Sequence, residues 1–377
     1  MLNAPLFILE SDDWGAGDHQ QSQSLGKINT MLKACLLADG GNPVMTLGVT
    51  LLAPRVSVKD SHCVIETVSL AAPESQKTLI SLLEVQREGL MPLQLHGRLH
   101  FNTDCLQSYM DSQFKDETRA ENNPVELGKS IPIEVFPAEV QSRWCSAESD
   151  AERQAMDEVL EHKDVFGMMP SVAVPPTFVW NDEVEAGWLK GGITTLMTPG
   201  HRSVERDGDH FVRDRRDIAN GDLTASGLLC LVRNGYFEPY KGVGVNQCLQ
   251  MVEHAIACGR PAIIETHRWN YIHPDLSVRE RCYSELASLL RIVVERYPAV
   301  ASVSSEVLAD RYRSNPRPAA SREESYFILP LWKRIPAWQA RLDGSEIPKL
   351  FRWVTGIAAI LWIGRQLLVL NAGFKHE

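Results

Sequence analysis

Short apolar runs recur along the first 300 residues and alternate with amphipathic segments. Seven runs have the length and the polar or turn-forming borders of buried strands: Leu6–Glu10, Val44–Leu52, Met91–Leu95, Thr177–Trp180, Ile193–Thr198, Ala262–Glu265 and Val300–Val303. Continuous apolar runs of this kind are typical of strands that are covered on both faces. The pattern therefore predicts a mostly parallel sheet.

Segments with helical spacing fall between these runs. We predict helices over 78–88, 149–162, 245–258 and 277–296. The first ends at Gly89, a residue that readily adopts the left-handed conformation after a helix, and the second begins with the capping box Ser149–Glu152. Strands that alternate with helices predict an α/β fold. About seven repeats favour a closed or nearly closed barrel, with an open sheet as the alternative.

Polar residues with chemical potential follow three of the predicted strands. Asp12 and Asp13 come after the first run, His96 and His100 follow the third, and His267 follows the run at 262–265. The carboxyl ends of parallel strands converge on one face, where active sites are built. We therefore expect these three groups to meet, although they are far apart in the sequence.

Two imidazoles and one carboxylate, with a position left for water, form a catalytic zinc-type site. His96 and His100 are four residues apart, so they would share a face if their loop enters a helix. A divalent cation offsets the repulsion between Asp12 and Asp13, and other metals of the first transition row would also suit these ligands. One aspartate can bind the metal while the other takes a proton from activated water. His267 is placed to protonate a leaving group.

Composition and charge narrow the class of protein. Apolar residues make up 44% of the chain, charged residues 23%, and the net charge is -10. An acidic chain is a poor match for general nucleic-acid binding, which needs a basic surface. Eight cysteines without a CxxC pair favour a reducing compartment. Because the apolar run at Leu6–Glu10 resembles a core strand and not a signal peptide, we expect a cytoplasmic protein.

The C-terminal region has a different pattern. Residues 353–370 are apolar except for Arg365 and Gln366, and LWKRIPAW (331–338) mixes tryptophan with basic residues. A spanning helix needs about 20 apolar residues, and a central charge is costly there. We predict that residues 351–370 contact the inner leaflet as an interfacial anchor. A terminal helix docked on the barrel or on a second subunit is the alternative.

The motifs together resemble those of the polysaccharide deacetylase family (NodB homology, carbohydrate esterase family 4). The family motifs are Asp-Asp after the first strand, His-x-x-x-His, and a later histidine at a strand end. The segments EVQREGLMPLQLHGRLH and PAVASVSSEVLADRY resemble the surroundings of its metal histidines and its last strand and helix. The resemblance covers roughly residues 5–312 and implies a distorted (β/α)7 barrel over 1–312. A linker over 313–330 and a hydrophobic helical tail over 331–377 would follow.

The resemblance also implies a role for each motif residue. Asp12 would be the general base, Asp13, His96 and His100 the metal ligands, and His267 the general acid. The expected reaction is hydrolysis of an N-acetyl or, alternatively, an O-acetyl group on a saccharide or lipid-linked saccharide precursor, with Zn²⁺ as the cation. The residues predicted to contact this acetylated substrate are Trp14, Trp180, Trp269, Glu238, Arg268 and Asn270. Packing in the core or at the rim is the alternative for the tryptophans.

Three departures from the family pattern predict a divergent member. Gly97 stands where the family has serine or threonine after the first metal histidine. The third motif, SVAVPPTFVWND (171–182), keeps its prolines but has no arginine to orient the base. The aspartate that tunes the catalytic histidine has no clear counterpart, and Glu238 in NGYFEP could replace it.

Two competing functions remain at this point. A two-carboxylate glycosidase needs no metal, but that chemistry leaves His96 and His100 without a role. A carbohydrate-binding barrel that has lost turnover is the second alternative, raised by the missing arginine.

Overall fold

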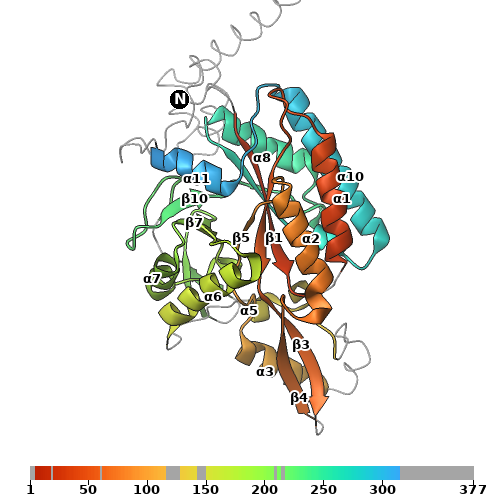
Figure 1. Cartoon of the computed structure of the whole chain (residues 1–377), viewed down its shortest axis with the longest axis vertical. Coiled ribbons are helices and arrows are strands. Elements are labelled where there is room, and N and C mark those ends of the chain that lie inside the picture. The colour runs from red at the N-terminus through yellow and green to blue at the C-terminus, as the bar shows by residue number, and fades with distance from the viewer. Residues whose placement is uncertain are drawn as a thin grey trace, which may run out of the picture.

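A computed structural model describes residues 5–17, 20–59, 62–115, 128–141, 150–207, 210–213 and 217–314. Eight strands form one parallel sheet in the order β10-β7-β6-β5-β2-β1-β12-β11. Their bounds in chain order are β1 (Phe7–Gly15), β2 (Met45–Thr50), β5 (Leu93–Leu95), β6 (Val172–Ala173), β7 (Thr195–Thr198), β10 (Leu229–Val232), β11 (Gly235–Tyr236) and β12 (Ala262–His267). β1 lies near the centre of the molecule (Figure 1) and is buried along its whole length.

The two edge strands of this sheet are almost continuous in sequence. Only Arg233 and Asn234 separate β10 from β11. The N–H of Arg233 donates to the carbonyl of Thr198 on β7 at 2.9 Å, and the N–H of Asn234 donates to Ile263 on β12 at 3.0 Å. One extended segment therefore pairs with β7 and then with β12, which makes the sheet curl until its edges meet. With β10 and β11 sharing one position, the predicted distorted (β/α)7 barrel is confirmed.

Helices surround the barrel, as the alternating pattern predicted. They are α1 (Gln21–Ala34), α2 (Gln76–Arg87), α6 (Ala151–Phe166), α7 (Asp182–Gly191), α8 (Val245–Ala257), α10 (Leu276–Arg296) and α11 (Ser305–Ser314). Figure 1 shows α1, α2 and α10 on one side of the sheet and α6 and α7 on another. α8 buries the predicted stripe that includes Cys248, Leu249 and Val252. The four predicted helices agree with α2, α6, α8 and α10 within a few residues at their ends. Ser149 of the predicted capping box lies outside the described residues.

Insertions after the carboxyl ends of two barrel strands build a small second layer. The hairpin of β3 (Leu52–Lys59) and β4 (His62–Ser69) follows β2, and α3 (Thr103–Lys115), η2 (Ile133–Val135) and α5 (Ala138–Gln141) follow β5. Val56, Phe101 and Phe136 share a core of their own with these elements, and Figure 1 shows the hairpin and α3 projecting from the barrel. The remaining short elements are η1 (Pro73–Ser75), η3 (Pro176–Phe178), β8 (Ser203–Asp207), β9 (His210–Arg213), η4 (Pro239–Lys241) and α9 (Trp269–Ile272).

Two of the seven predicted strands are wrong. Thr177–Trp180 overlaps the 3-10 turn η3, where Thr177 and Phe178 have positive φ, and the barrel strand is Val172–Ala173 just before it. Pro175 and Pro176 lack N–H groups and cannot continue a central strand. Val300–Val303 contributes only an isolated bridge between Ala301 and Leu6. The pattern also missed the barrel segment 229–236, which is interrupted by polar residues at its middle, and the hairpins β3–β4 and β8–β9.

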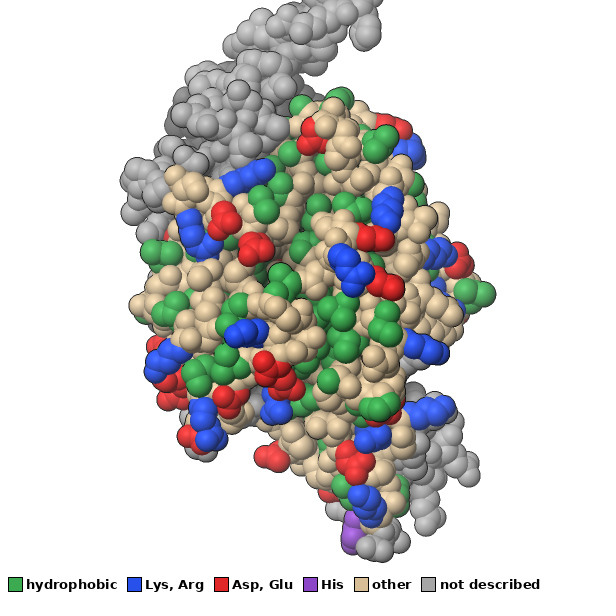
Figure 2. Space-filling view, viewed as in Figure 1, with side chains coloured by type: hydrophobic (Ala, Val, Ile, Leu, Met, Phe, Trp, Pro, Cys, Tyr) green, Lys and Arg blue, Asp and Glu red, His purple; other side chains and the backbone are tan. Residues whose placement is uncertain are grey.

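The C-terminal tail predicted over 331–377, with its anchor at 351–370 and most of its linker, lies outside the described residues. None of the helices in the described part of the chain is long and apolar enough to cross a membrane. On the face shown in Figure 2, acidic and basic side chains of the described residues are interspersed. That face carries no continuous basic strip of the kind that binds nucleic acid.

Candidate active site

Asp12 and Asp13 lie at an irregularity of β1. The pairing of β1 with β2 shifts register between Ser11 and Trp14, and Asp13 has a φ of 72°. In a regular strand two successive side chains point to opposite faces, so this bulge changes where the adjacent carboxylates point. A left-handed non-glycine residue costs on the order of 1–3 kcal/mol and persists where the surroundings enforce it. Both carboxylates line one cavity at the mouth of the barrel.

Asp13, His96 and His100 form a compact, buried cluster. Oδ1 of Asp13 lies 3.2 Å from Nε2 of His96 and 3.3 Å from Nε2 of His100, and the ligand atoms of the three residues lie within 4.8 Å of one another. The cluster is the set of side chains for which the sequence predicted a metal.

The hydrogen bonds of His96 show that this cluster fits a cation. Nδ1 of His96 lies 2.9 Å from the carbonyl of Val174, which can only accept, so Nδ1 carries a proton and Nε2 is the ring nitrogen that faces Asp13. Burial lowers the pKa of His96, but the charges of Asp12 and Asp13 outweigh burial and raise it. Burial lowers the pKa of His100 to about 4, which keeps that ring neutral near pH 7. The carboxylates thus favour a positive charge at this point, either a proton on Nε2 of His96 or a metal ion bound by the three residues. One carboxylate and two neutral imidazoles are the ligands of a catalytic zinc-type site, with the tautomer set by the outer hydrogen bond.

The four-residue spacing suggested that the two histidines share one face of a helix, but neither of them lies on a helix. They belong to the loop between β5 and α3, which begins only at Thr103. Gly97 has a φ of +79°, and a Cβ there would lie 2.9 Å from Cγ of Pro176. A glycine at this position, where the family has serine or threonine, is thus required by the backbone and by the close approach of Pro176.

Arg233 supplies the positive charge that seemed to be missing beside Asp12. Its Nη1 and Nη2 donate to Oδ2 and Oδ1 of Asp12 at 2.5 and 2.9 Å. Burial raises the pKa of Asp12, but the charge of Arg233 and the nearby His96 outweigh burial and leave the pKa below its ordinary value. The carboxylate is therefore ionised at neutral pH, and both of its oxygens are held in place.

The carboxylate of Glu10 holds the guanidinium of Arg233 on the side away from Asp12. Nε of Arg233 donates to Oε2 of Glu10 at 2.6 Å, and the hydroxyl of Ser305 donates to the other oxygen of Glu10. Glu265 lies 3.5 Å from Nη1 of Arg233. Arg233 was not predicted from the sequence as a site residue, although Arg233 directly follows the apolar strand β10.

His267 lies beside Asp12, because these residues are partners in the pairing of β1 with β12. Its Nδ1 donates to Oε1 of Glu238 at 2.6 Å. Burial alone would lower the pKa of His267, but the charge and hydrogen bond of Glu238, with the charges of Asp13 and Glu265, raise the pKa to about 10. His267 is therefore protonated at neutral pH. Glu238, which was named from the sequence as a replacement for the missing aspartate, is the carboxylate that accepts this hydrogen bond.

Four of the predicted substrate contacts have other roles. Trp14 and Trp180 are fully buried; Trp14 stacks on Tyr271, and Trp180 packs in the core beneath β6 and α7. The strand and the turn that carry them direct the large apolar rings inward, so neither ring reaches a sugar.

Arg268 and Asn270 are likewise engaged inside the protein. Arg268 is buried and donates to both oxygens of Glu134 at 2.8 and 3.0 Å. Asn270 is buried and donates to Oε2 of Glu238 at 2.8 Å and to Thr266 at 3.0 Å. Asn270 thus orients the partner of His267, and Arg268 ties the inserted layer to the barrel. Trp269 is half-buried, with its ring edge-on to His273.

A cavity of about 380 Å³ is lined by Asp12, Asp13, His96, His100 and His267. Residues from four parts of the chain complete its wall: Glu134, Gln141, Pro175, Thr177, Phe178, Tyr236, Tyr240, Lys241 and Glu265. The ring of Tyr236 is edge-on to His267 at 6.2 Å. The sequence predicted none of these wall residues as a substrate contact, since no local pattern shows that η2, η3 and η4 border the same space.

The comparisons with known proteins are consistent with this fold. No protein-family model and no curated protein matches the sequence. A family 4 carbohydrate esterase from Streptomyces lividans is 10% identical over 80% of this chain and 93% of its own, with a TM-score of 0.37. A peptidoglycan deacetylase from Bacillus subtilis is 12% identical over 83% of this chain and 94% of its own, with a TM-score of 0.38.

A third similar structure is a family 4 pseudoenzyme from Bacillus anthracis. It is 11% identical over 80% of this chain and 64% of its own, with a TM-score of 0.37. Several structural neighbours therefore come from the family that the motifs resemble. Because identity and TM-score are low throughout, we argue the function from the geometry of the site.

Proposed function

We propose that this protein is a metal-dependent carbohydrate deacetylase that hydrolyses an N-acetyl group on a saccharide. The observation that carries the proposal is the convergence of Asp13, His96 and His100 on one point, with Asp12 and His267 in the same cavity. A divalent cation held by the three ligands, Zn²⁺ by their chemistry, would supply Lewis-acid activation of water and of the acetyl carbonyl.

The residues of the chain divide the proton transfers between them. Asp12, ionised and held by Arg233, accepts a proton from the attacking water. His267, protonated because Glu238 raises its pKa, donates a proton to the departing amine. One water and one amide thus give acetate and a free amino sugar, and general acid–base transfer of this kind contributes about 10²–10⁴-fold in rate.

Metal analysis together with acetate release tests this proposal. The purified protein should bind one divalent ion per chain, and His96→Ala and His100→Ala should lose it. Asp12→Asn should keep the ion and lose about 10²–10⁴-fold in acetate release from acetylated amino sugars. Bound metal without acetate release from any of them would favour a non-catalytic carbohydrate-binding barrel. Cleavage of glycosidic bonds by the metal-free protein would favour the glycosidase alternative.

We further propose a cytoplasmic location, with peripheral membrane contact through residues 351–370 and a lipid-linked saccharide as the natural substrate. The apolar composition of that segment and its basic flank at Lys349 and Arg352 support the contact. Deleting residues 351–377 should release the protein from membranes in a flotation assay. Equal membrane binding after the deletion would contradict this part of the proposal.

A further inference from the structure

Glu265 is an acidic side chain of the candidate active site that takes no part in the proposed metal binding or proton transfers. It precedes His267 by two positions on β12, and alternate residues of a strand point to the same face. Both side chains line the cavity that contains Asp12. The side chain of Glu265 is only 13% exposed. A carboxylate with so little exposure is costly unless it is paired or bound to a ligand.

The contacts of Glu265 leave its oxygens able to accept hydrogen bonds. Oε1 lies 3.5 Å from Nε2 of His267, and Oε2 lies 3.5 Å from Nη1 of Arg233. These are ion-pair distances, longer than the hydrogen bonds by which Arg233 holds Glu10 and Asp12. Among the residues that the structure describes, none donates a hydrogen bond to the carboxylate of Glu265. Glu265 thus faces the cavity as a charged acceptor.

The leaving atom of a substrate would lie beside this acceptor. Nδ1 of His267 is bound to Glu238, so Nε2 is the nitrogen that can donate a proton to the leaving atom. An atom that is hydrogen-bonded to Nε2 lies about 2.9 Å from it. Because Oε1 of Glu265 is 3.5 Å from Nε2, the same atom can also lie about 2.9 Å from Oε1. Glu265 can therefore accept a hydrogen bond from the leaving atom if that atom carries a hydrogen.

An amide and an ester differ at this atom. The amide nitrogen carries a hydrogen that can donate to Glu265 while the nitrogen takes the proton from Nε2 of His267. An ester oxygen has only lone pairs, so one of them would face the carboxylate and be repelled. A site built to bind a substrate N–H discriminates against an analogue that lacks it, because the buried acceptor is then left unpaired.

We propose that Glu265 determines the leaving group, by accepting a hydrogen bond from the departing nitrogen and by repelling an ester oxygen. The inference rests on the proposed function and deepens it, since it assigns the residue that selects N-acetyl over O-acetyl groups. As the C–N bond breaks, the proton of Nε2 of His267 passes to the nitrogen, and the hydrogen that the nitrogen already carries stays directed at Glu265. The nitrogen becomes more positive when it takes the proton, and the adjacent carboxylate stabilises that charge.

Two substrates that differ only at the leaving group test this assignment, namely methyl glucosides that carry a 2-acetamido or a 2-O-acetyl group. Since esters are intrinsically easier to hydrolyse than amides, the readout is the change in the ratio of the two kcat/KM values. Glu265→Gln keeps the shape of the side chain and removes its charge. It should lower kcat/KM for the acetamide about tenfold, the effect of losing a charged hydrogen bond, and should not lower kcat/KM for the ester.

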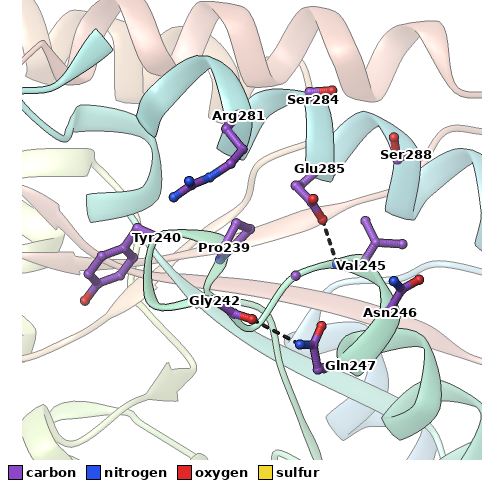
Figure 3. Close-up of a pocket in the computed structure, with 11 residues that line it drawn as sticks. Pro239, Tyr240, Gly242, Val245, Asn246, Gln247, Arg281, Ser284, Glu285 and Ser288 are labelled. Carbon is purple, nitrogen blue, oxygen red and sulfur yellow. Dashed lines mark hydrogen bonds between the residues drawn. The ribbon is translucent and has the colours of Figure 1, made fainter. Parts of the chain in front are cut away.

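An equal loss with both substrates would overturn the assignment. It would show that Glu265 acts only through Arg233 and Asp12, because Asp12 activates the water in both reactions. Glu285→Gln is the matched control. Glu285 belongs to a separate hollow formed by η4, α8 and α10, where its Oε2 accepts from the N–H of Val245 at 2.7 Å (Figure 3). Replacing Glu285 should change neither kcat/KM value.

Binding of the amine product tests the same contact without turnover. In calorimetry, methyl 2-amino-2-deoxyglucoside should bind the Zn²⁺-loaded wild type more tightly than methyl glucoside, and Glu265→Gln should reduce this preference about tenfold. Equal affinity for the two ligands in the wild type, or an unchanged preference in Glu265→Gln, would overturn the assignment. Amine binding that depends on Glu265, without acetate release, would refute the hydrolase and keep Glu265 as the group that recognises the nitrogen. Acetate release with an unchanged ratio of substrates would do the reverse.

Discussion

Arg233 and Asp12 are joined by two hydrogen bonds, with Nη1 2.5 Å from Oδ2 and Nη2 2.9 Å from Oδ1. The pair is buried, and Nε of the same guanidinium is held by Glu10. The orientation of the proposed base therefore depends on a residue 221 positions away in the sequence. The third motif at 171–182 lacks the arginine that the resemblance led us to expect there, and the arginine that holds Asp12 instead follows β10.

Replacing Arg233 should damage both folding and activity. Arg233→Met leaves two buried carboxylates without their partner, and breaking a buried pair in this way costs about 3–5 kcal/mol. Arg233→Lys keeps the charge but not the two-pronged geometry, so it should fold and lose about 10²-fold in kcat because Asp12 is misplaced. Urea unfolding and acetate release measure these effects. Wild-type kcat in a folded Arg233→Lys variant would show that Asp12 needs no orientation.

Glu238→Gln should narrow the pH range of activity on its alkaline side. Glu238 raises the pKa of His267 to about 10, and removing its charge lowers that pKa. Since His267 must be protonated to act as the acid, activity should then fall at a lower pH than in the wild type. The measurement is kcat/KM against pH, with the exposed Glu280→Gln as the control. An alkaline limb that does not move would mean that His267 is not the acid.

Gly48 makes room for the carboxylate of Asp12. A Cβ on Gly48 would lie 2.4 Å from Oδ1 of Asp12 and 3.3 Å from Cβ of His96. Gly48→Ala should therefore displace Asp12 from Arg233 and lower kcat by about 10²-fold, the usual effect of a displacement near 1 Å. Metal analysis of the same variant shows whether the displacement spreads to His96.

Gly26→Ala is the control for that substitution, because an added Cβ on Gly26 of α1 meets no atom within 4 Å. Alanine in a helix interior is favoured over glycine by about 0.5–1 kcal/mol. Gly26→Ala should thus raise stability slightly and leave kcat unchanged. Full activity in Gly48→Ala would show that the crowding at Asp12 is relieved elsewhere.

Metal removal should destabilise the wild type but not Asp13→Asn. Asparagine tolerates the positive φ of this position, so the variant should fold, but it removes the charge that holds the cation. At 100 times Kd a ligand stabilises the folded state by about 2.7 kcal/mol. Thermal unfolding with Zn²⁺ and with a chelator should therefore differ in the wild type and coincide in Asp13→Asn. Equal zinc stabilisation of both proteins would place the metal elsewhere.

The parts of the site that follow from local order could be predicted from the residues alone. Asp12, Asp13 and His267 lie at the carboxyl ends of β1 and β12, and His96 and His100 follow β5. Parallel strands deliver such residues to one end of a barrel. The helical stripes were also readable, as in α8, because burial of one face imposes a regular spacing along the chain. The motifs and most of the barrel could therefore be predicted.

Which side chains contact these residues could not be predicted, because it depends on how the closed barrel packs. Trp14 and Trp180 carry suitable rings for a sugar, yet both are buried in the core. The type of a residue does not show whether its side chain will face the cavity or the core. Arg233 and Glu238 reach Asp12 and His267 because the segment 229–236 closes the barrel between β7 and β12. Pairing across such sequence separations depends on barrel closure, which leaves no periodic signal in the chain.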